Sequence, residues 1–233
     1  MSNALLIGIG IVVVVLIYSS VSFYQQIRTS RTLVAHAQPY SLESTDYTTT
    51  LLVLGDSTGV GVGATRPLDS VAGQFAQHVG ATYVENYSVS GATVADLASQ
   101  MQHITRQDYT YVLIQIGGND IIAFHNARAA GDELARMLSQ LPTWENLYLL
   151  SAGNVGAATL FPRVIRPFHT RLNLRYHDVF ETVVTDIGGI YVNLYLPPAE
   201  DPFTKEPEVY LAEDGLHPSS AGYKLWFQTI PLP

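Results

Sequence analysis

The chain has 233 residues, of which 47% are apolar and 14% are charged, and its formal net charge is −8. This length suits one well-packed domain with an additional segment, and the negative charge argues against a nucleic-acid partner. The sequence contains no cysteine, which excludes disulfide bonds, thiolate catalysis and cysteine metal ligands.

The N-terminal stretch from Ala4 to Tyr24 contains no charged residue. A helix of roughly 20 residues spans the hydrocarbon core of a bilayer. We therefore predict a single membrane-spanning anchor over residues 1–27, a juxtamembrane stalk over residues 28–49 and a folded domain over residues 50–233. A signal peptide cleaved near residues 35–37 is the alternative interpretation.

The orientation of this predicted anchor depends on few charges. Arg28 and Arg31 follow the apolar stretch, and no basic residue precedes it. The positive-inside rule then places the domain in the cytoplasm. An outward-facing enzyme on a single N-terminal anchor fits the sequence equally well, so both orientations stay open.

Strand-like and helix-like segments alternate from residue 50 onward. Short apolar or β-branched runs predict strands over residues 51–55, 83–87, 111–116, 147–150 and 190–194. Amphipathic segments predict helices over residues 70–79, 94–104, 129–141, 164–184 and 219–229. This alternation predicts a five-stranded parallel sheet with helices on both faces.

Polar residues follow the predicted strands at the edge where parallel sheets bind ligands. Ser57 follows the first strand, Gly91 the second and Asn119 the third, while Asp214 and His217 arrive on a late loop. Serine needs a base to become a nucleophile, and histidine oriented by a carboxylate is the usual base. Backbone amides and an asparagine amide suit the oxyanion of a tetrahedral intermediate. The pattern therefore predicts acyl transfer.

Four separated blocks in this order resemble the SGNH hydrolases, the GDSL-type serine esterases. The blocks are Gly55-Asp56-Ser57, the loop with Gly91, Gly117-Gly118-Asn119-Asp120, and the Asp214 to Pro218 segment. The resemblance covers about residues 50–230 and implies a three-layer α/β/α, flavodoxin-like fold. It also implies hydrolysis of esters or thioesters, with Ser57 as nucleophile, His217 as base and Asp214 as its orienting partner. Ser57, Gly91 and Asn119 would form the oxyanion hole.

Two other functions are compatible with parts of the sequence. Gly59, Gly61 and Gly63, with Glu85 further on, imitate a dinucleotide-binding turn, although the glycine spacing departs from the usual fingerprint. A non-catalytic, envelope-binding module on a hydrolase scaffold is the other alternative. We predict no cofactor and no metal site, since the eight-residue spacing of His169 and His177 does not suit a metal clamp.

The substrate is the least defined part of the prediction. The implied catalytic residues serve acetylesterases, lysophospholipases and thioesterases alike, so the motifs alone do not choose among them. We expect an acyl-ester, acylated glycan or lipid substrate, with residues 152–168 along one wall of the pocket and residues 197–209 along another. Asp56 and Asp120 are expected to bind loop amides rather than to react. The sequence makes no prediction of oligomeric state.

Overall fold

The computed structural model describes residues 3–232, with side chains from Ser20 onward. Its centre is a parallel sheet with the strand order β2-β1-β3-β4-β5. The strands are β1 (Thr50–Gly55), β2 (Tyr83–Asn86), β3 (Asp108–Gln115), β4 (Thr143–Leu150) and β5 (Ile190–Val192). This is the strand order of flavodoxin-like sheets, so the predicted five-stranded α/β fold is confirmed.

The helices alternate with these strands. Each of the five helical segments predicted for the folded domain contains a helix within a few residues, whereas the short helices at residues 57–60, 118–122, 202–205 and 207–210 are not predicted. The helices are α1 (Asn3–His36), α2 (Ser57–Val60), α3 (Val71–His78), α4 (Leu97–Met101), α5 (Gly118–Ile122), α6 (Ala127–Leu138), α7 (Arg166–Asp186), α8 (Pro202–Lys205), α9 (Pro207–Tyr210) and α10 (Ser220–Phe227). Single 3-10 turns occupy η1 (Pro67–Asp69), η2 (Val94–Asp96) and η3 (Val155–Ala157).

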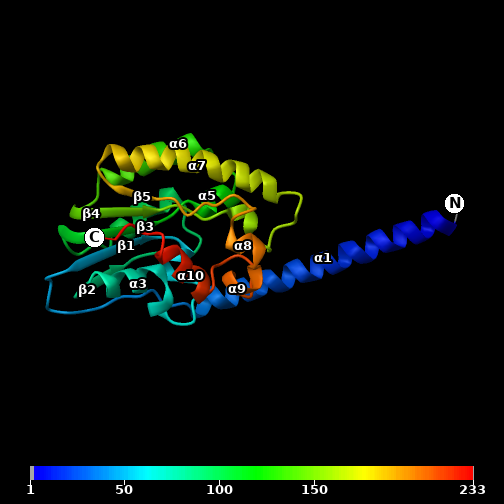
Figure 1. Ribbon diagram of the computed structural model, residues 1–233, viewed down its shortest axis with the longest axis horizontal. Coiled ribbons are helices and arrows are strands. Elements are labelled where there is room, and N and C mark those ends of the chain that lie inside the picture. The colour runs from blue at the N-terminus through cyan, green and yellow to red at the C-terminus, as the bar shows by residue number, and fades with distance from the viewer. Residues whose placement is uncertain (1–2, 233) are drawn as a thin grey trace.

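Helices cover both faces of the sheet, which gives three layers (Figure 1). On one face, α4, α6 and α7 pack against the sheet through a core that includes Leu134 and Phe180. On the other face, α3 and α10 contribute Phe75 and Tyr223 to a second core. Every residue of β1 is buried. Burial on both faces explains why the strand is a continuous apolar run without polar alternation.

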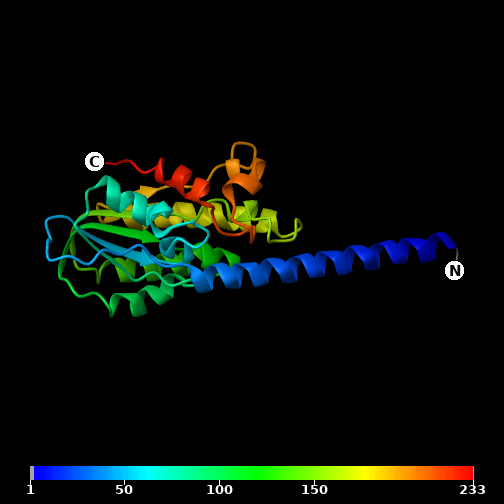
Figure 2. The same ribbon diagram turned by 90° about the horizontal axis from the view of Figure 1, so that it is seen from below.

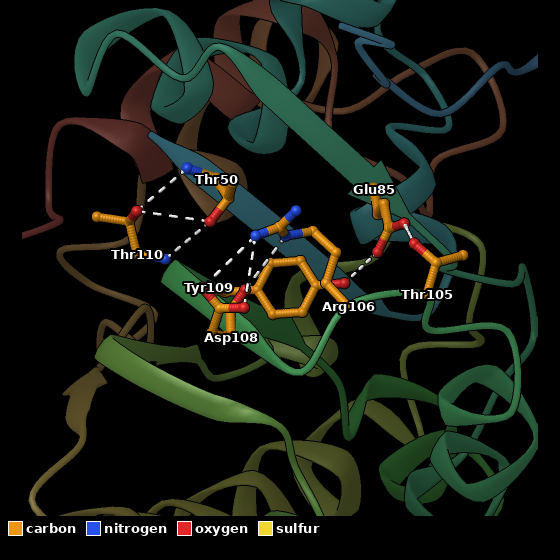
Figure 3. Close-up of polar contacts among 7 residues, drawn as sticks. All are labelled: Thr50, Glu85, Thr105, Arg106, Asp108, Tyr109 and Thr110. Atoms are coloured by element: carbon orange, nitrogen blue, oxygen red, sulfur yellow. Dashed lines mark hydrogen bonds and ion pairs between the residues drawn. The ribbon is translucent and has the colours of Figure 1, made fainter. Parts of the chain in front are cut away.

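Polar contacts fasten β1, β2 and β3 to one another (Figure 3). Thr50 and Thr110 each donate a backbone N–H to the other's hydroxyl, at 3.2 and 3.0 Å. The buried carboxylate of Glu85 accepts hydrogen bonds from the hydroxyls of Thr105 and Tyr109. These side chains satisfy polar groups that would otherwise be costly within the core.

The N-terminal helix α1 extends away from the three layers in both views (Figures 1 and 2). Within the residues that the structure describes, none of the helices combines the length and apolar character that a membrane crossing requires. The described side chains of α1, from Ser20 to His36, include Gln25, Arg28 and Arg31, while residues 4–19 of the predicted apolar run lie outside the described side chains. This finding contradicts the predicted single-pass anchor and the membrane localisation based on it.

The segment after α1 returns to the sheet rather than remaining separate from it. Leu42 forms an isolated antiparallel bridge with Val84 of β2, through N–H to carbonyl distances of 3.1 and 2.9 Å. Part of the segment predicted as a stalk thus covers the edge strand, where unpaired backbone groups would otherwise be exposed. The predicted boundaries at residues 27/28 and 49/50 remain predictions.

Candidate active site

Ser57 is the first residue of α2 and follows β1 after a single connecting residue, Asp56. The Asp56 carboxylate caps this short helix by accepting a hydrogen bond from the backbone N–H of Thr58 at 2.8 Å. Gly55 must be a glycine, because a Cβ there would lie 2.1 Å from the Gln115 carbonyl oxygen. The close approach of β1 and β3 thereby places Ser57 at the carboxyl edge of the sheet.

Ser57, His217 and Asp214 form a continuous hydrogen-bonded row. His217 Nε2 lies 2.9 Å from Ser57 Oγ, and His217 Nδ1 lies 2.6 Å from Asp214 Oδ2. All three side chains are buried, Asp214 completely. Since a carboxylate only accepts, Nδ1 carries the hydrogen and Nε2 is left to accept the proton of Ser57. The structure therefore brings the predicted serine, histidine and aspartate together.

Asp214, at the end of this row, and Asp56, next to Ser57, have pKa values shifted in opposite directions. Burial raises the pKa of Asp214, but the hydrogen bond and charge of His217, with two backbone N–H donors, outweigh burial and lower it. Burial raises the pKa of Asp56 to about 6, against smaller opposing effects from Thr58 and His217. Asp214 is thus ionised at neutral pH and can stabilise a protonated His217.

Asn119 lies in the first turn of α5, and Gly91 lies on the loop after β2. The Asn119 side-chain amide donates to the carbonyl oxygen of Ala92 at 2.9 Å, which links α5 to the loop that carries Gly91. Gly91 has a φ of +87°, a conformation that favours glycine. Asn119 lines the pocket at Ser57, whereas Gly91 is not among its lining residues.

A small, largely apolar pocket opens beside Ser57 and has a volume of about 90 Å³. Of the two predicted walls, residues 152–168 contribute Ala152, Val155 and neighbouring positions, and residues 197–209 contribute Phe203. Ile116 and Trp226 complete much of the apolar lining. Such a pocket excludes water from part of the site and suits a short apolar group.

Comparison with protein families decides which kind of enzyme carries this site. The model of the GDSL-like lipase/acylhydrolase family matches residues 53–225. The chain belongs to this family. It is therefore a GDSL-type carboxylic ester hydrolase, as the four sequence blocks predict. A comparison with curated proteins finds no significant match.

Solved structures of this family share the fold at low sequence identity. A lipolytic G-D-S-L family protein from Veillonella parvula has a TM-score of 0.61 at 12% identity, over 78% of this chain and 95% of its own. Phospholipase A1 from Streptomyces albidoflavus has a TM-score of 0.55 at 17% identity, over 76% and 94% of the two chains. A variant of an acetyl-xylooligosaccharide esterase from a Geobacillus species has a TM-score of 0.55 at 22% identity, over 80% and 94%.

Trp226 is one of the pocket residues of this GDSL-type hydrolase that the sequence pattern does not reveal. It lies on α10, whose apolar positions alone predict an ordinary core residue. Its indole packs against Gly153, where a Cβ would lie 2.8 Å from the ring. Within the described part of the chain, its buried Nε1–H has no hydrogen-bond partner. Only the packing of α10 against the loop after β4 reveals this contact.

The remaining polar residues singled out from the sequence have contacts away from Ser57 Oγ. Asp120 accepts a hydrogen bond from the Val94 backbone N–H at 3.0 Å, consistent with the expected binding of loop amides. Glu85 accepts hydrogen bonds from the hydroxyls of Thr105 and Tyr109 and does not line the pocket at Ser57. The dinucleotide interpretation therefore lacks its acidic residue at the site. In the described residues, no group of three His, Asp or Glu side chains is arranged to hold a metal ion.

Proposed function

We propose that this GDSL-type hydrolase cleaves carboxylic esters through an acyl-enzyme on Ser57. His217 takes the Ser57 proton as the oxygen attacks the ester carbonyl, and then gives that proton to the leaving alcohol. Asp214 holds the imidazole in the required tautomer and stabilises its protonated form. A water molecule, activated by His217, then releases the carboxylic acid.

The negative oxygen of the tetrahedral intermediate requires donors that are already in position. We assign this role to the backbone N–H groups of Ser57 and Gly91 and to the side-chain amide of Asn119. One N–H of that amide is used by Ala92, which leaves the second for the oxyanion. The bond to Ala92 also fixes the amide relative to the Gly91 loop. Asn119 is thus supported before substrate arrives.

We further propose that the acyl part of the substrate is short and apolar. Phe203 and Trp226, both buried, narrow the pocket beside Ser57, and its volume is about 90 Å³. An acetyl to butyryl group is compatible with this space, and a long chain requires an opening beyond it. The acetyl-xylooligosaccharide esterase among the similar structures is named for a short-acyl substrate, which fits this proposal. Lysophospholipase or thioesterase specificity at the same site is the alternative.

The observation that carries the proposal is the hydrogen-bonded row from Ser57 through His217 to Asp214. The test is hydrolysis of nitrophenyl esters from acetyl to palmitoyl by the purified full-length chain. We expect acetyl and butyryl esters to be cleaved at least 10-fold faster, as kcat/KM, than palmitoyl esters. Faster cleavage of the palmitoyl ester would contradict the short-acyl assignment.

The nucleophile is tested separately with two serine variants. Ser57→Ala is expected to lose hydrolysis and labelling by a fluorophosphonate probe, whereas Ser99→Ala, on an exposed position of α4, is expected to retain both. Activity retained by Ser57→Ala would refute the assigned nucleophile. A folded wild-type chain that neither hydrolyses esters nor reacts with the probe would favour the non-enzymatic, binding-module alternative.

A further inference from the structure

A second and larger hollow lies beside the Ser57 pocket and has a volume of about 870 Å³. It shares two lining residues, Asn154 and Ala157, with the Ser57 pocket. Among the described residues that line it are Arg163, Arg166 and Arg171, but no Asp or Glu. We call this hollow the arginine groove.

The groove is positively charged, although the chain as a whole is negatively charged. The whole protein carries a net charge of −8, yet residues 161–177 contain four of its 12 basic residues and no acidic residue. The ion pairs formed by described arginine side chains involve Arg66, Arg106 and Arg136 instead. Over the described part of the chain, the three groove arginines therefore have no carboxylate partner within salt-bridge distance.

Arg166 is held in place at the floor of this region. Its Nε and Nη2 groups donate to the carbonyl oxygens of Phe161 and Thr159, at 2.9 and 3.1 Å. Burial, followed by the charge of the neighbouring Arg163, lowers the pKa of Arg166. Arg163 and Arg166 thus line the same groove, and neither has a carboxylate within salt-bridge distance among the described residues. An anion bound between them would remove this repulsion.

We propose that the arginine groove binds a phosphate group on the alcohol part of the ester substrate. This inference rests on the proposed function of Ser57. A phosphate group offers up to two negative charges and several terminal oxygens, which suits several guanidinium groups better than a single carboxylate does. The start of α7 at Arg166 adds the positive end of a 21-residue helix to the same place.

The position of the groove matches the direction in which the alcohol leaves. The acyl group occupies the Ser57 pocket, and the alcohol passes along the shared wall at Asn154 and Ala157. When Ser57 Oγ bonds to the carbonyl carbon, the bond from that carbon to the alcohol oxygen breaks. The Ser57 proton reaches the alcohol oxygen through His217, and the phosphate-bearing alcohol departs. Water then cleaves the acyl-enzyme to give the carboxylic acid.

The test compares two substrates that differ only in the phosphate group. We expect the full-length chain to hydrolyse 1-butyryl-glycerol 3-phosphate with a higher kcat/KM than 1-butyryl-glycerol. In the double variant Arg163→Gln, Arg171→Gln, the ratio of the two kcat/KM values should fall by about 10- to 100-fold, as expected for lost charge-assisted hydrogen bonds. Arg166 is left unchanged because its guanidinium also supports two backbone carbonyls.

The matched control is the double variant Arg128→Gln, Arg175→Gln. It also removes two positive charges, one from α6 and one from α7, but at exposed positions outside the groove. The substrate ratio should then remain close to that of the wild type. An equal loss in both double variants would indicate long-range charge and would overturn the groove assignment.

Further outcomes separate this inference from the proposed function. If the groove variant keeps the wild-type substrate ratio while Ser57→Ala loses both activities, the phosphate proposal fails and the ester hydrolase stands. If butyryl glycerate, with a carboxylate in place of phosphate, is preferred equally, the phosphate assignment is wrong. Inorganic phosphate should inhibit hydrolysis of the phosphate substrate competitively, and non-competitive inhibition would place the anion outside the substrate path.

Discussion

The side chain of Gln100 forms two hydrogen bonds with the backbone of Gly55, the last residue of β1. Gly55 N–H donates to Gln100 Oε1 at 2.9 Å, and Gln100 Nε2 donates to the Gly55 carbonyl at 2.7 Å. Gln100 lies on α4 and is almost completely buried. A helix side chain thus pairs with both backbone groups of Gly55, two residues before Ser57, and the Gly55 carbonyl also accepts a hydrogen bond from the Val89 N–H at 3.0 Å.

Replacing Gln100 with leucine should destabilise the domain, because the substitution leaves the buried N–H of Gly55 without its partner, while the carbonyl keeps its hydrogen bond from the Val89 N–H. An unpaired buried N–H costs about 1–3 kcal/mol. We expect urea unfolding of Gln100→Leu to show this loss in the free energy of unfolding. Gln102→Leu, at the exposed end of α4, should change it by no more than about 0.5 kcal/mol. Equal stability of the two variants would refute the proposed support of β1.

Asn119→Ala should lower kcat by about 10²- to 10³-fold, the usual effect of losing one donor to the oxyanion. The measurement is steady-state hydrolysis of nitrophenyl butyrate. Asn126→Ala is the matched control, because Asn126 caps α6 through a hydrogen bond to Ala129 N–H. That variant should lose about 1 kcal/mol of stability and keep its kcat. An Asn119→Ala enzyme with wild-type kcat would remove Asn119 from the oxyanion hole.

Asp214→Asn should lower kcat by about 10³- to 10⁴-fold, because the amide no longer favours the imidazole tautomer that accepts the Ser57 proton. The KM value should change much less. Glu213→Gln makes the same change of charge at the exposed neighbouring position and should remain close to wild type. The comparison of kcat and KM for the two variants separates an orienting carboxylate from a general effect of charge on the loop.

Asp56→Asn should stabilise the protein at neutral pH. Burial raises the pKa of Asp56 from 3.8 to about 6, so the folded state favours the protonated form. The stability contributed by protonated Asp56 is full below pH about 4 and is lost as the pH rises through about 6. A shift of this size corresponds to on the order of 3 kcal/mol. Urea unfolding at pH 4 and pH 7 should show the gain of Asp56→Asn only at pH 7, whereas the exposed Asp132→Asn should show none.

Glu85→Gln should have the opposite dependence on pH. Burial raises the pKa of Glu85, but hydrogen bonds from Thr105, Tyr109 and Tyr83 outweigh burial and lower it. The stability contributed by ionised Glu85 is present above the usual carboxyl pKa and is lost as the pH falls through its lowered value. We expect the variant to be less stable than wild type at pH 7 and closer to it at pH 3. Glu145→Gln, at an exposed position of β4, is the control, and an identical pH profile would contradict this role.

The sequence was informative where a local pattern had one physical meaning. Strands buried on both faces read as continuous apolar runs, so β1 and β3 were found within a few residues. Ser57, Asp214 and His217 were also found, because serine, aspartate and histidine at the ends of predicted strands and on a late loop suggest one chemistry. Their roles remain proposals, although the hydrogen bonds among them match those roles.

Features that depend on tertiary packing were not visible in the sequence. Nothing in the α4 pattern indicates that Gln100 binds Gly55, and nothing in α10 indicates that Trp226 narrows a pocket. The arginines of residues 163–171 are spaced along a turn and a helix, and only folding places them around one groove. The predicted membrane anchor is wrong for another reason. It rests on the absence of charge between Ala4 and Tyr24, and the helices of the described residues do not combine the length and apolar character that a crossing requires.

The 160 positions that separate Ser57 from His217 set an order of events during synthesis. The same late segment carries Tyr223, whose hydroxyl donates to the Val62 carbonyl at 2.7 Å, so the loop after the nucleophile also depends on it. A nascent chain that stops before Asp214 holds Ser57 but neither the histidine nor this support. Completion of the site therefore requires the segment from Asp214 to Tyr223 to fold against residues 57–62, and the onset of esterase activity during refolding would report this long-range contact.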